Sequence, residues 1–175
     1  MRHLLAITGS ARGDGNTALM VAHLRRALDL RDDQIVDLQS CRLEPFRYDA
    51  PPADDFLGIV ERMLAHRHIV FATPVYWYAM SGLLKTFFDR LTDLLLSASG
   101  RRHGRALAGR DIWLIATGTD PTLPDGFTEP FARTADYFDM RWRQAFYIRV
   151  PKDPLPAGHE FAEVDELAAA IRASR

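Results

Sequence analysis

The chain has little cysteine, almost no net charge and no long apolar run. Its 175 residues contain one cysteine, Cys41, which excludes an internal disulfide and favours a reducing compartment. The 22 basic and 23 acidic residues give a formal net charge of -1, so no strong field attracts a nucleic-acid backbone or an anionic membrane. The apolar stretch near the N-terminus is too short for a signal peptide or a membrane span. We therefore expect a cytoplasmic protein that binds neither nucleic acid nor membrane.

The sequence also lacks repeats, low-complexity tracts and linkers, and 47% of its residues are hydrophobic. These properties predict a single domain spanning residues 1–175. Short apolar runs alternate with segments whose apolar residues repeat at helical spacing. The expected strands are 4–8, 35–38, 68–73, 111–117 and 145–150, and the expected helices are 17–30, 54–64, 81–96, 126–138 and 160–171. Five strands alternating with five helices predict an α/β fold with a parallel sheet covered on both faces.

Three loops of this fold are expected at one edge of the sheet. Because each crossover is right-handed, the loops that follow the strands share that edge, and ligands of open α/β sheets bind there. The search for a site therefore narrows to residues 9–17, 74–78 and 118–124.

The first loop, residues 9–17, reads Gly-Ser-Ala-Arg-Gly-Asp-Gly-Asn-Thr and joins a buried strand to a helix start. Its glycines let N–H groups turn inward, the helix N-terminus adds positive potential and Arg12 adds a guanidinium, so the loop suits an anion. A triphosphate loop needs a lysine where Asn16 stands, and a dinucleotide fingerprint needs its glycines directly after the strand. A cradle for one phosphate remains, the alternative being a plain turn before a helix capped by Asn16.

The second loop carries three consecutive aromatic residues, Tyr76, Trp77 and Tyr78, after the stiffening Pro74. Three aromatics in a row are not expected to point into one core. An aromatic loop beside a monophosphate cradle fits flavin mononucleotide (FMN), with the ring on the second loop and the phosphate on the first. The alternative is that these aromatics pack beneath the loop or at a subunit contact.

The string from Thr73 to Arg90 reads Thr-Pro-Val-Tyr-Trp-Tyr-Ala-Met-Ser-Gly-Leu-Leu-Lys-Thr-Phe-Phe-Asp-Arg. It closely resembles the signature of the NADPH-dependent FMN reductase family, which belongs to the flavodoxin-like superfamily. The first loop resembles the phosphate loop of that family, with Ala11 where a proline is common. The resemblance implies a three-layer α/β/α flavodoxin-like fold whose five-stranded parallel sheet has the order 2-1-3-4-5.

The resemblance further implies FMN as cofactor, NADPH or NADH as reductant, and a small-molecule electron acceptor such as a flavin or a quinone. Carried over by position, the residues around the FMN phosphate are Ser10, Arg12, Asn16 and Thr17, and those around the ring are Pro74, Val75, Tyr76, Trp77, Tyr78, Thr117, Gly118 and Thr119. Because the cofactor performs the hydride chemistry, no catalytic side chain is assigned. Backbone N–H groups near Gly118 are candidate donors to the ring. Related flavoproteins often place the ring at a dimer contact, so a homodimer or homotetramer is expected, with the apolar helix 83–96 as modest support.

Two other functions stay open, a flavodoxin-type electron carrier and a flavin-binding protein without turnover. The near-neutral charge and the compact first loop disfavour the carrier. Some relatives hold an iron–sulfur cluster on a group of cysteines after the second strand, and a lone Cys41 excludes that cluster. His66 and His68 alternate at a strand start, but no further ligand stands at metal-binding spacing, so no metal is expected.

Two charged segments have open interpretations. Residues 101–110 are expected as a basic connection, usually a solvated loop, and Arg101 and Arg102 there are an alternative site for the 2′-phosphate of NADPH. Lys85, Asp89 and Arg90 are expected in helix packing or dimer contacts, or on a solvated ion-pair face.

Overall fold

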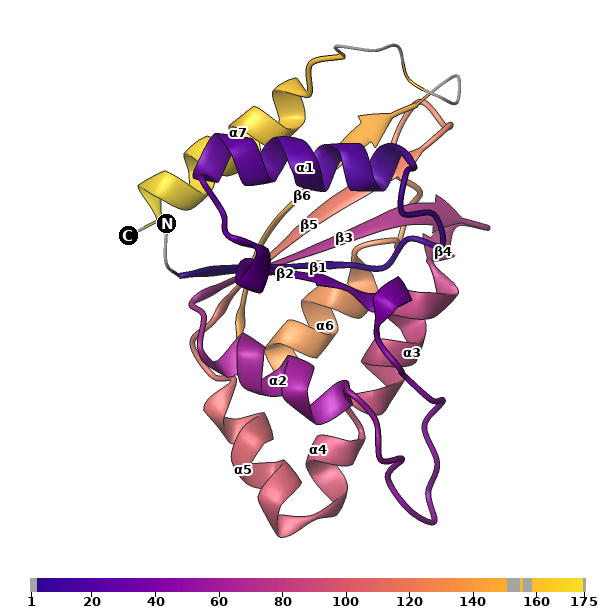
Figure 1. Cartoon of the computed structure of the whole chain (residues 1–175), viewed down its shortest axis with the longest axis vertical. Helices are drawn as coiled ribbons and strands as arrows, with labels where there is room; N and C mark the ends of the chain where they lie inside the picture. Colours follow the sequence, from indigo (N-terminus) through magenta and orange to yellow (C-terminus); the bar gives the residue numbers. More distant parts are fainter. Residues whose placement is uncertain (1–2, 151–154, 156–158, 175) are drawn as a thin grey trace.

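The computed structural model describes residues 3–150, 155 and 159–174, and its strands form one six-stranded sheet (Figure 1). The strands are β1 (Leu4–Thr8), β2 (Ile35–Asp37), β3 (His68–Tyr76), β4 (Ala79–Met80), β5 (Asp111–Gly118) and β6 (Arg141–Arg149). Five of them run parallel in the order β2-β1-β3-β5-β6, and β4 pairs antiparallel with β3 alone. The predicted strand order is confirmed, with β4 as an addition.

Helices cover both faces of the sheet, which confirms the three-layer α/β/α fold. The helices are α1 (Asn16–Leu28), α2 (Phe56–Leu64), α3 (Gly82–Arg90), α4 (Asp93–Leu96), α5 (Ala98–Ala106), α6 (Glu129–Tyr137) and α7 (Ala162–Ala173), with 3-10 turns η1 (Asp32–Gln34) and η2 (Leu38–Ser40). Figure 1 shows α1 and α7 on one face, and α2, α3 and α6 on the other with α4 and α5 beyond them.

Each face of the sheet has its own apolar core. Alternate residues of β1 point to opposite faces, so Leu5 and Ile7 join the core under α2, α3 and α6, while Leu4 and Ala6 join the core under α1 and α7. All five residues of β1 are buried. This two-sided burial explains why the strand reads as a continuous apolar run rather than an alternating one.

The third strand continues beyond its predicted end at Thr73, and Pro74 lies inside it. The pairing of β1 with β3 stops at Ala72, where Gly9 N donates to Ala72 O at 2.8 Å. The next bond of a parallel ladder would run from residue 74 to the Gly9 carbonyl, and proline has no N–H for it. The Ser81 hydroxyl donates to that carbonyl instead. The chain can therefore leave β1 at this point while β3 continues along β5.

The predicted helix 81–96 and the predicted loop 101–110 are both wrong in part. The helix ends as α3 at Arg90, and bonds from Leu94 N to Leu91 O and from Leu95 N to Thr92 O are of the tighter 3-10 type. Residues 98–106 form helix α5 rather than a loop.

Two glycines are required for the close packing of α5, and one of them, Gly104, lies within the predicted loop. A Cβ atom on Gly100 would lie 2.5 Å from the Asp93 carbonyl oxygen, and one on Gly104 would lie 3.2 Å from the Phe138 ring. These contacts let α5 approach α4 and α6 closely. Composition alone does not separate such glycines from those of a turn.

Smaller boundary errors have local causes. The cap of α1 is Gly15 rather than Asn16, and α6 begins at Glu129, three residues after the left-handed Gly126. Strand β6 begins at Arg141 rather than residue 145, because polar residues open it. Arg141 and Arg143 each donate from Nε to the buried Asp111 carboxylate at 2.7 Å, which fixes this polar start to β5.

Candidate functional site

A cleft at the carboxyl end of the sheet is lined by all twelve residues predicted from the sequence. It consists of two hollows of about 180 Å³ each, which share Val75, Gly118 and Thr119. One hollow is lined by Ser10, Arg12, Gly15, Asn16, Thr17, Pro74, Val75, Tyr76, Thr117, Gly118, Thr119 and Val150. The other is lined by Val75, Trp77, Tyr78, Gly118, Thr119, Asp120 and Tyr147. In Figure 1 this end of the sheet lies beside β4 and the start of α1.

The loop after β1 forms one end of the cleft. Ser10 Oγ donates to Arg12 O at 3.1 Å and accepts from Arg12 N at 3.3 Å, which folds the loop back on itself. The N-terminus of α1 follows at Gly15, with no acidic residue in its first turn. A Cβ atom on Gly15 would lie 3.3 Å from that of Arg12, so a larger residue would crowd the loop. The helix dipole and the guanidinium together suit an anion.

Two contacts hold this loop in place. Thr17 and Thr117 are both buried, and their hydroxyl oxygens lie 3.3 Å apart across the floor of the cleft. Gln39, which follows β2, donates from Nε2 to Ala11 O at 2.8 Å. The loop is therefore attached to β5 on one side and to the end of β2 on the other.

The aromatic segment after β3 is a tight hairpin. Tyr76 pairs with Ala79, which leaves Trp77 and Tyr78 as the two turn residues, with φ angles of 49° and 65°. Positive φ at both central positions defines a type I′ turn, which usually contains Asn-Gly. Trp77 is 93% exposed and Tyr78 is 69% exposed. These two side chains therefore do not pack beneath the loop, and both line one of the two hollows.

Ser81 connects the hairpin to the first loop. It caps α3, where Leu84 N donates to Ser81 Oγ at 3.2 Å, and its own N–H donates to Thr73 Oγ1 at 3.0 Å. The same Ser81 hydroxyl donates to the Gly9 carbonyl, and a Cβ atom on Gly9 would lie 2.7 Å from that of Leu84. The first loop, β3 and α3 thus meet at a buried serine that sequence reasoning did not single out.

The segment after β5 forms the opposite wall and brings in residues that the sequence did not indicate. Tyr147, on β6, donates its hydroxyl to Asp120 O at 2.8 Å, and a Cβ atom on Gly118 would lie 2.8 Å from that hydroxyl. Burial, and then the Asp120 carboxylate, raise the pKa of Tyr147, so it remains a protonated donor. Gly15, Val150, Asp120 and Tyr147 complete the lining. Asp120 lies in the range 118–124 that the sequence indicated, whereas only its place in the fold identifies Tyr147.

The charged residues of the segment from Thr73 to Arg90 have separate roles. Arg90 is 1% exposed, donates from Nε to Asp93 at 2.7 Å and from Nη1 to Glu44 O at 3.0 Å, and pairs with Asp54. It packs helix α3 against the loop before α2, and the solvated-face alternative is wrong for it. Lys85 and Asp89 instead form an exposed pair at 2.5 Å.

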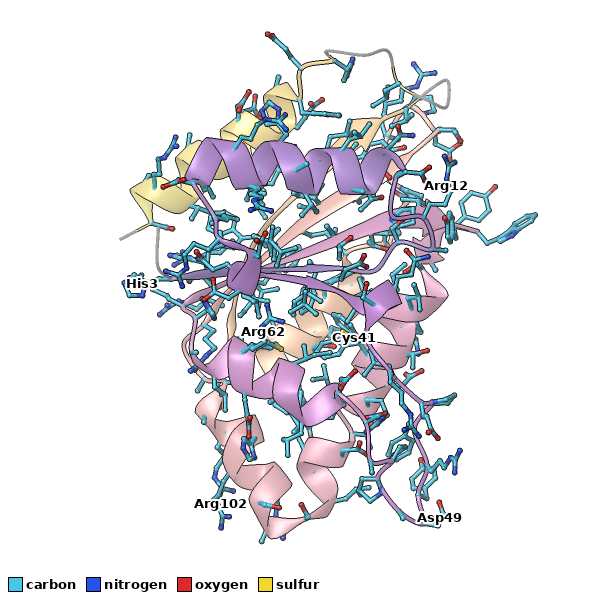
Figure 2. All side chains as sticks on the ribbon, in the orientation of Figure 1. His3, Arg12, Cys41, Asp49, Arg62 and Arg102 are labelled. Carbon is cyan, nitrogen blue, oxygen red and sulfur yellow. The ribbon has the colours of Figure 1, made fainter. Side chains whose placement is uncertain are left out.

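The basic run and the histidines lie apart from the cleft or have other contacts. Figure 2 shows Arg102 at the opposite end of the molecule from Arg12, so this chain does not place residues 101–105 beside its own cleft. His66 Nδ1 contacts Arg62 O at 2.7 Å, whereas His68 lies near Asp111 and Trp113, and burial lowers the pKa of His68. Among the described residues, no three histidine, cysteine, aspartate or glutamate side chains form a metal-binding group.

Cys41 is a half-buried thiol. Its Sγ donates to Asp37 O at 3.3 Å, and burial raises its pKa. Its side chain packs against the core. Within the described part of the chain, no helix has both the length and the apolar character needed to cross a bilayer.

Comparison with known proteins agrees with this geometry. The model of the NADPH-dependent FMN reductase family matches residues 2–122. A Bacillus subtilis (strain 168) protein, YwqN, named as an NAD(P)H-dependent FMN-containing oxidoreductase, is 31% identical over 127 residues, which cover 67% of each chain. The Trp repressor binding protein of Bacillus subtilis has a TM-score of 0.68 at 25% identity, covering 86% of this chain and 90% of its own.

A further solved structure supports the fold. General stress protein 14 of Treponema denticola, solved in complex with FMN, has a TM-score of 0.63 at 20% identity and covers 98% of this chain and 96% of its own. The family match spans both loops that line the cleft, from Gly9 to Thr17 and from Pro74 to Tyr78. The chain therefore belongs to the NADPH-dependent FMN reductase family and is an FMN-dependent NAD(P)H oxidoreductase.

Proposed function

We propose that the cleft binds FMN with its phosphate on the loop after β1 and its ring between the hairpin and the segment after β5. The observation that carries the proposal is the convergence of twelve predicted residues, from three separate loops, on one continuous cleft. The loop geometry fits a phosphate, because backbone N–H groups and a helix N-terminus meet there beside Arg12 and no acidic residue stands in the first turn.

Each wall then has a distinct task. Ser10, Arg12, Asn16 and Thr17 hold the phosphate, and the buried Pro74 with Val75 and Tyr76 borders the middle of the cleft. Trp77 and Tyr78 border the mouth, and Thr117, Gly118 and Thr119 form the far wall. FMN, when bound, accepts and donates the hydride, so the protein's contribution is position and electrostatics. The exposed mouth leaves room for a nicotinamide and then a small acceptor, such as a flavin or quinone.

The phosphate assignment can be tested by comparing FMN with riboflavin, which lacks the phosphate. Arg12→Ala should weaken FMN binding by roughly ten-fold, as expected for the loss of a charge-assisted hydrogen bond, and should leave riboflavin binding unchanged. Arg102→Ala removes another exposed arginine, at the other end of the molecule, and is the matched control. Equal losses for both flavins, or no loss with either, would contradict the assignment.

Turnover is tested by mixing the flavin-loaded protein with NADH or NADPH without oxygen. Bleaching of the flavin spectrum is expected with at least one of them. A loaded protein that neither nucleotide bleaches would instead behave as a flavodoxin-type carrier or a binding protein without turnover.

We also propose a homodimer, with the apolar surface of α3, α4 and α6 as a candidate contact. A hollow of about 330 Å³ between α3–α4 and α6 is lined mainly by Phe88, Leu91, Leu95, Pro130, Tyr137 and Phe138. Leu95 and Leu96 are 36% and 46% exposed, whereas Leu84, Phe87, Leu91 and Leu94 belong to the core. Sedimentation of the wild type should give a dimer, and Leu96→Asp should shift the protein toward monomer.

A cytoplasmic location is proposed from the lone Cys41.

A further inference from the structure

The segment from Gly118 to Asp120 is fastened to β6 by three successive carbonyl groups. Val150 N donates to Gly118 O at 2.7 Å, Arg149 Nε donates to Thr119 O at 3.4 Å, and the Tyr147 hydroxyl donates to Asp120 O at 2.8 Å. Two of these three donors are side chains of β6. The segment is therefore held from the side of β6, opposite to β3, and Tyr147 itself lines the hollow.

This attachment determines where the N–H groups of the segment point. In a trans peptide unit the N–H points opposite to the carbonyl of the preceding residue. Because the Gly118 and Thr119 carbonyls point toward β6, the N–H groups of Thr119 and Asp120 point away from it. The sheet order places β3, with Val75, on that other side. Within the described part of the chain, neither N–H has a hydrogen-bond acceptor.

The same attachment explains the glycine. A Cβ atom at residue 118 would lie 2.8 Å from the Tyr147 hydroxyl oxygen and 3.3 Å from Val75 Cβ. Gly118 is thus held between β6 and β3 with no room for a side chain. The backbone at this point has little freedom to rotate its N–H groups elsewhere.

We propose that Tyr147 and Arg149 are positioning residues that aim the N–H groups of Thr119 and Asp120 at the acceptor edge of the flavin ring. This inference rests on the proposed function and extends it to two side chains of β6. They act through the backbone of the segment, and Tyr147 has the shorter contact. Donors at this edge favour the electron-rich reduced cofactor, so their loss should lower the midpoint potential of the bound flavin.

The test is Tyr147→Phe, which keeps the ring and removes the bond to Asp120. FMN should bind roughly two- to ten-fold more weakly, the loss expected for one neutral hydrogen bond, and the midpoint potential should become more negative. Tyr48→Phe, at an 86% exposed tyrosine in the loop before α2, is the matched control and should change neither quantity. A purely structural role would lower the melting temperature but leave the potential unchanged.

A second variant approaches the same contact from the other side. Gly118→Ala places a methyl group against the Tyr147 hydroxyl and should also weaken FMN and lower the potential. Part of this loss should be recovered in the Gly118→Ala/Tyr147→Phe double variant, because the hydroxyl is gone. If the wild type binds FMN while Tyr147→Phe and Gly118→Ala both keep its affinity and potential, the inference is wrong and the proposed function stands. If the wild type binds no FMN, both are wrong.

Discussion

Replacing the Trp77-Tyr78 turn by Asn-Gly should stabilise the cofactor-free protein and weaken its flavin binding. The two residues have φ angles of 49° and 65°, in the left-handed region that bulky side chains disfavour by roughly 1–2 kcal/mol each. They are 93% and 69% exposed, so their side chains lose little packing when removed. Asn-Gly is the pair that a type I′ hairpin favours.

For Tyr78→Gly alone, two opposing effects set the change in the free energy of unfolding. Relief of the left-handed strain contributes about 1–2 kcal/mol, and the greater freedom of glycine in the unfolded chain offsets about 0.4–1 kcal/mol of it. The net gain of about 1 kcal/mol should raise the melting temperature by roughly 2–4 °C for a domain of this size. Trp77→Asn should add a smaller gain, since asparagine tolerates positive φ.

Calorimetry of the cofactor-free variants measures the stability, and FMN titration measures the binding. Tyr48→Gly is the matched control, because Tyr48 is an exposed aromatic residue without a positive φ, and its melting temperature should not rise. Weaker FMN binding is expected only for the hairpin variants. A double variant at Trp77 and Tyr78 that melts below the wild type would refute the strain argument, and one that keeps full FMN affinity would refute the ring contact.

Three further outcomes follow from the buried polar groups. Ser81→Ala removes the cap of α3 and should reduce the free energy of unfolding by about 1–2 kcal/mol in urea titrations and weaken FMN binding, whereas Ser97→Ala, at the cap of α5, should reduce stability alone. Arg90→Met leaves the buried carboxylates of Asp54 and Asp93 without their cation and should reduce stability by about 3–5 kcal/mol, against about 0.5 kcal/mol or less for the exposed Lys85→Met. Burial would raise the pKa of Asp111, but hydrogen bonds from the surrounding arginines outweigh burial and hold the pKa below its ordinary value. The ionised Asp111 therefore stabilises the folded protein fully above about pH 4, and this stabilisation is lost as the pH falls through the folded-state pKa. Urea titrations between about pH 5 and pH 2 should show a shallower decline for Asp111→Asn than for the wild type, and an unchanged slope would count against the shift.

The sequence predicted those strands and helices whose local residue pattern already reflects how they are buried in the fold. Strand β1 is buried on both faces, so its four apolar residues, Leu4 to Ile7, identify it without knowledge of the rest of the chain. The polar start of β6 could not be recognised, because it joins the sheet through the backbone bond from Arg141 N to Arg110 O and through side-chain bonds to Asp111, about 30 residues away. Gly104 of α5 was misinterpreted for a similar reason, since it packs against Leu94 of α4 and against Phe138 at the end of α6.

The sequence indicated those residues of the cleft that lie near the carboxyl ends of the parallel strands. Ser10 and Thr17, Pro74 and Thr117 follow from the rule that loops after parallel strands share one edge. Tyr147 was not predictable, because nothing around it in sequence distinguishes it from a tyrosine of an ordinary strand. Its role arises from a bond to Asp120 and from the absence of a side chain at Gly118, and both depend on the packed sheet.

We propose that one cleft holds the phosphate of FMN on the loop after β1 and its ring against the segment after β5. A crystal structure of the protein grown with FMN tests this most directly. We expect phosphate oxygens within hydrogen-bond distance of Thr17 and of the N–H groups that follow Ser10. We also expect the hydrogen-bond acceptors of the ring to face the N–H groups of Thr119 and Asp120. A phosphate bound anywhere else, or a ring that does not contact that wall, would contradict it.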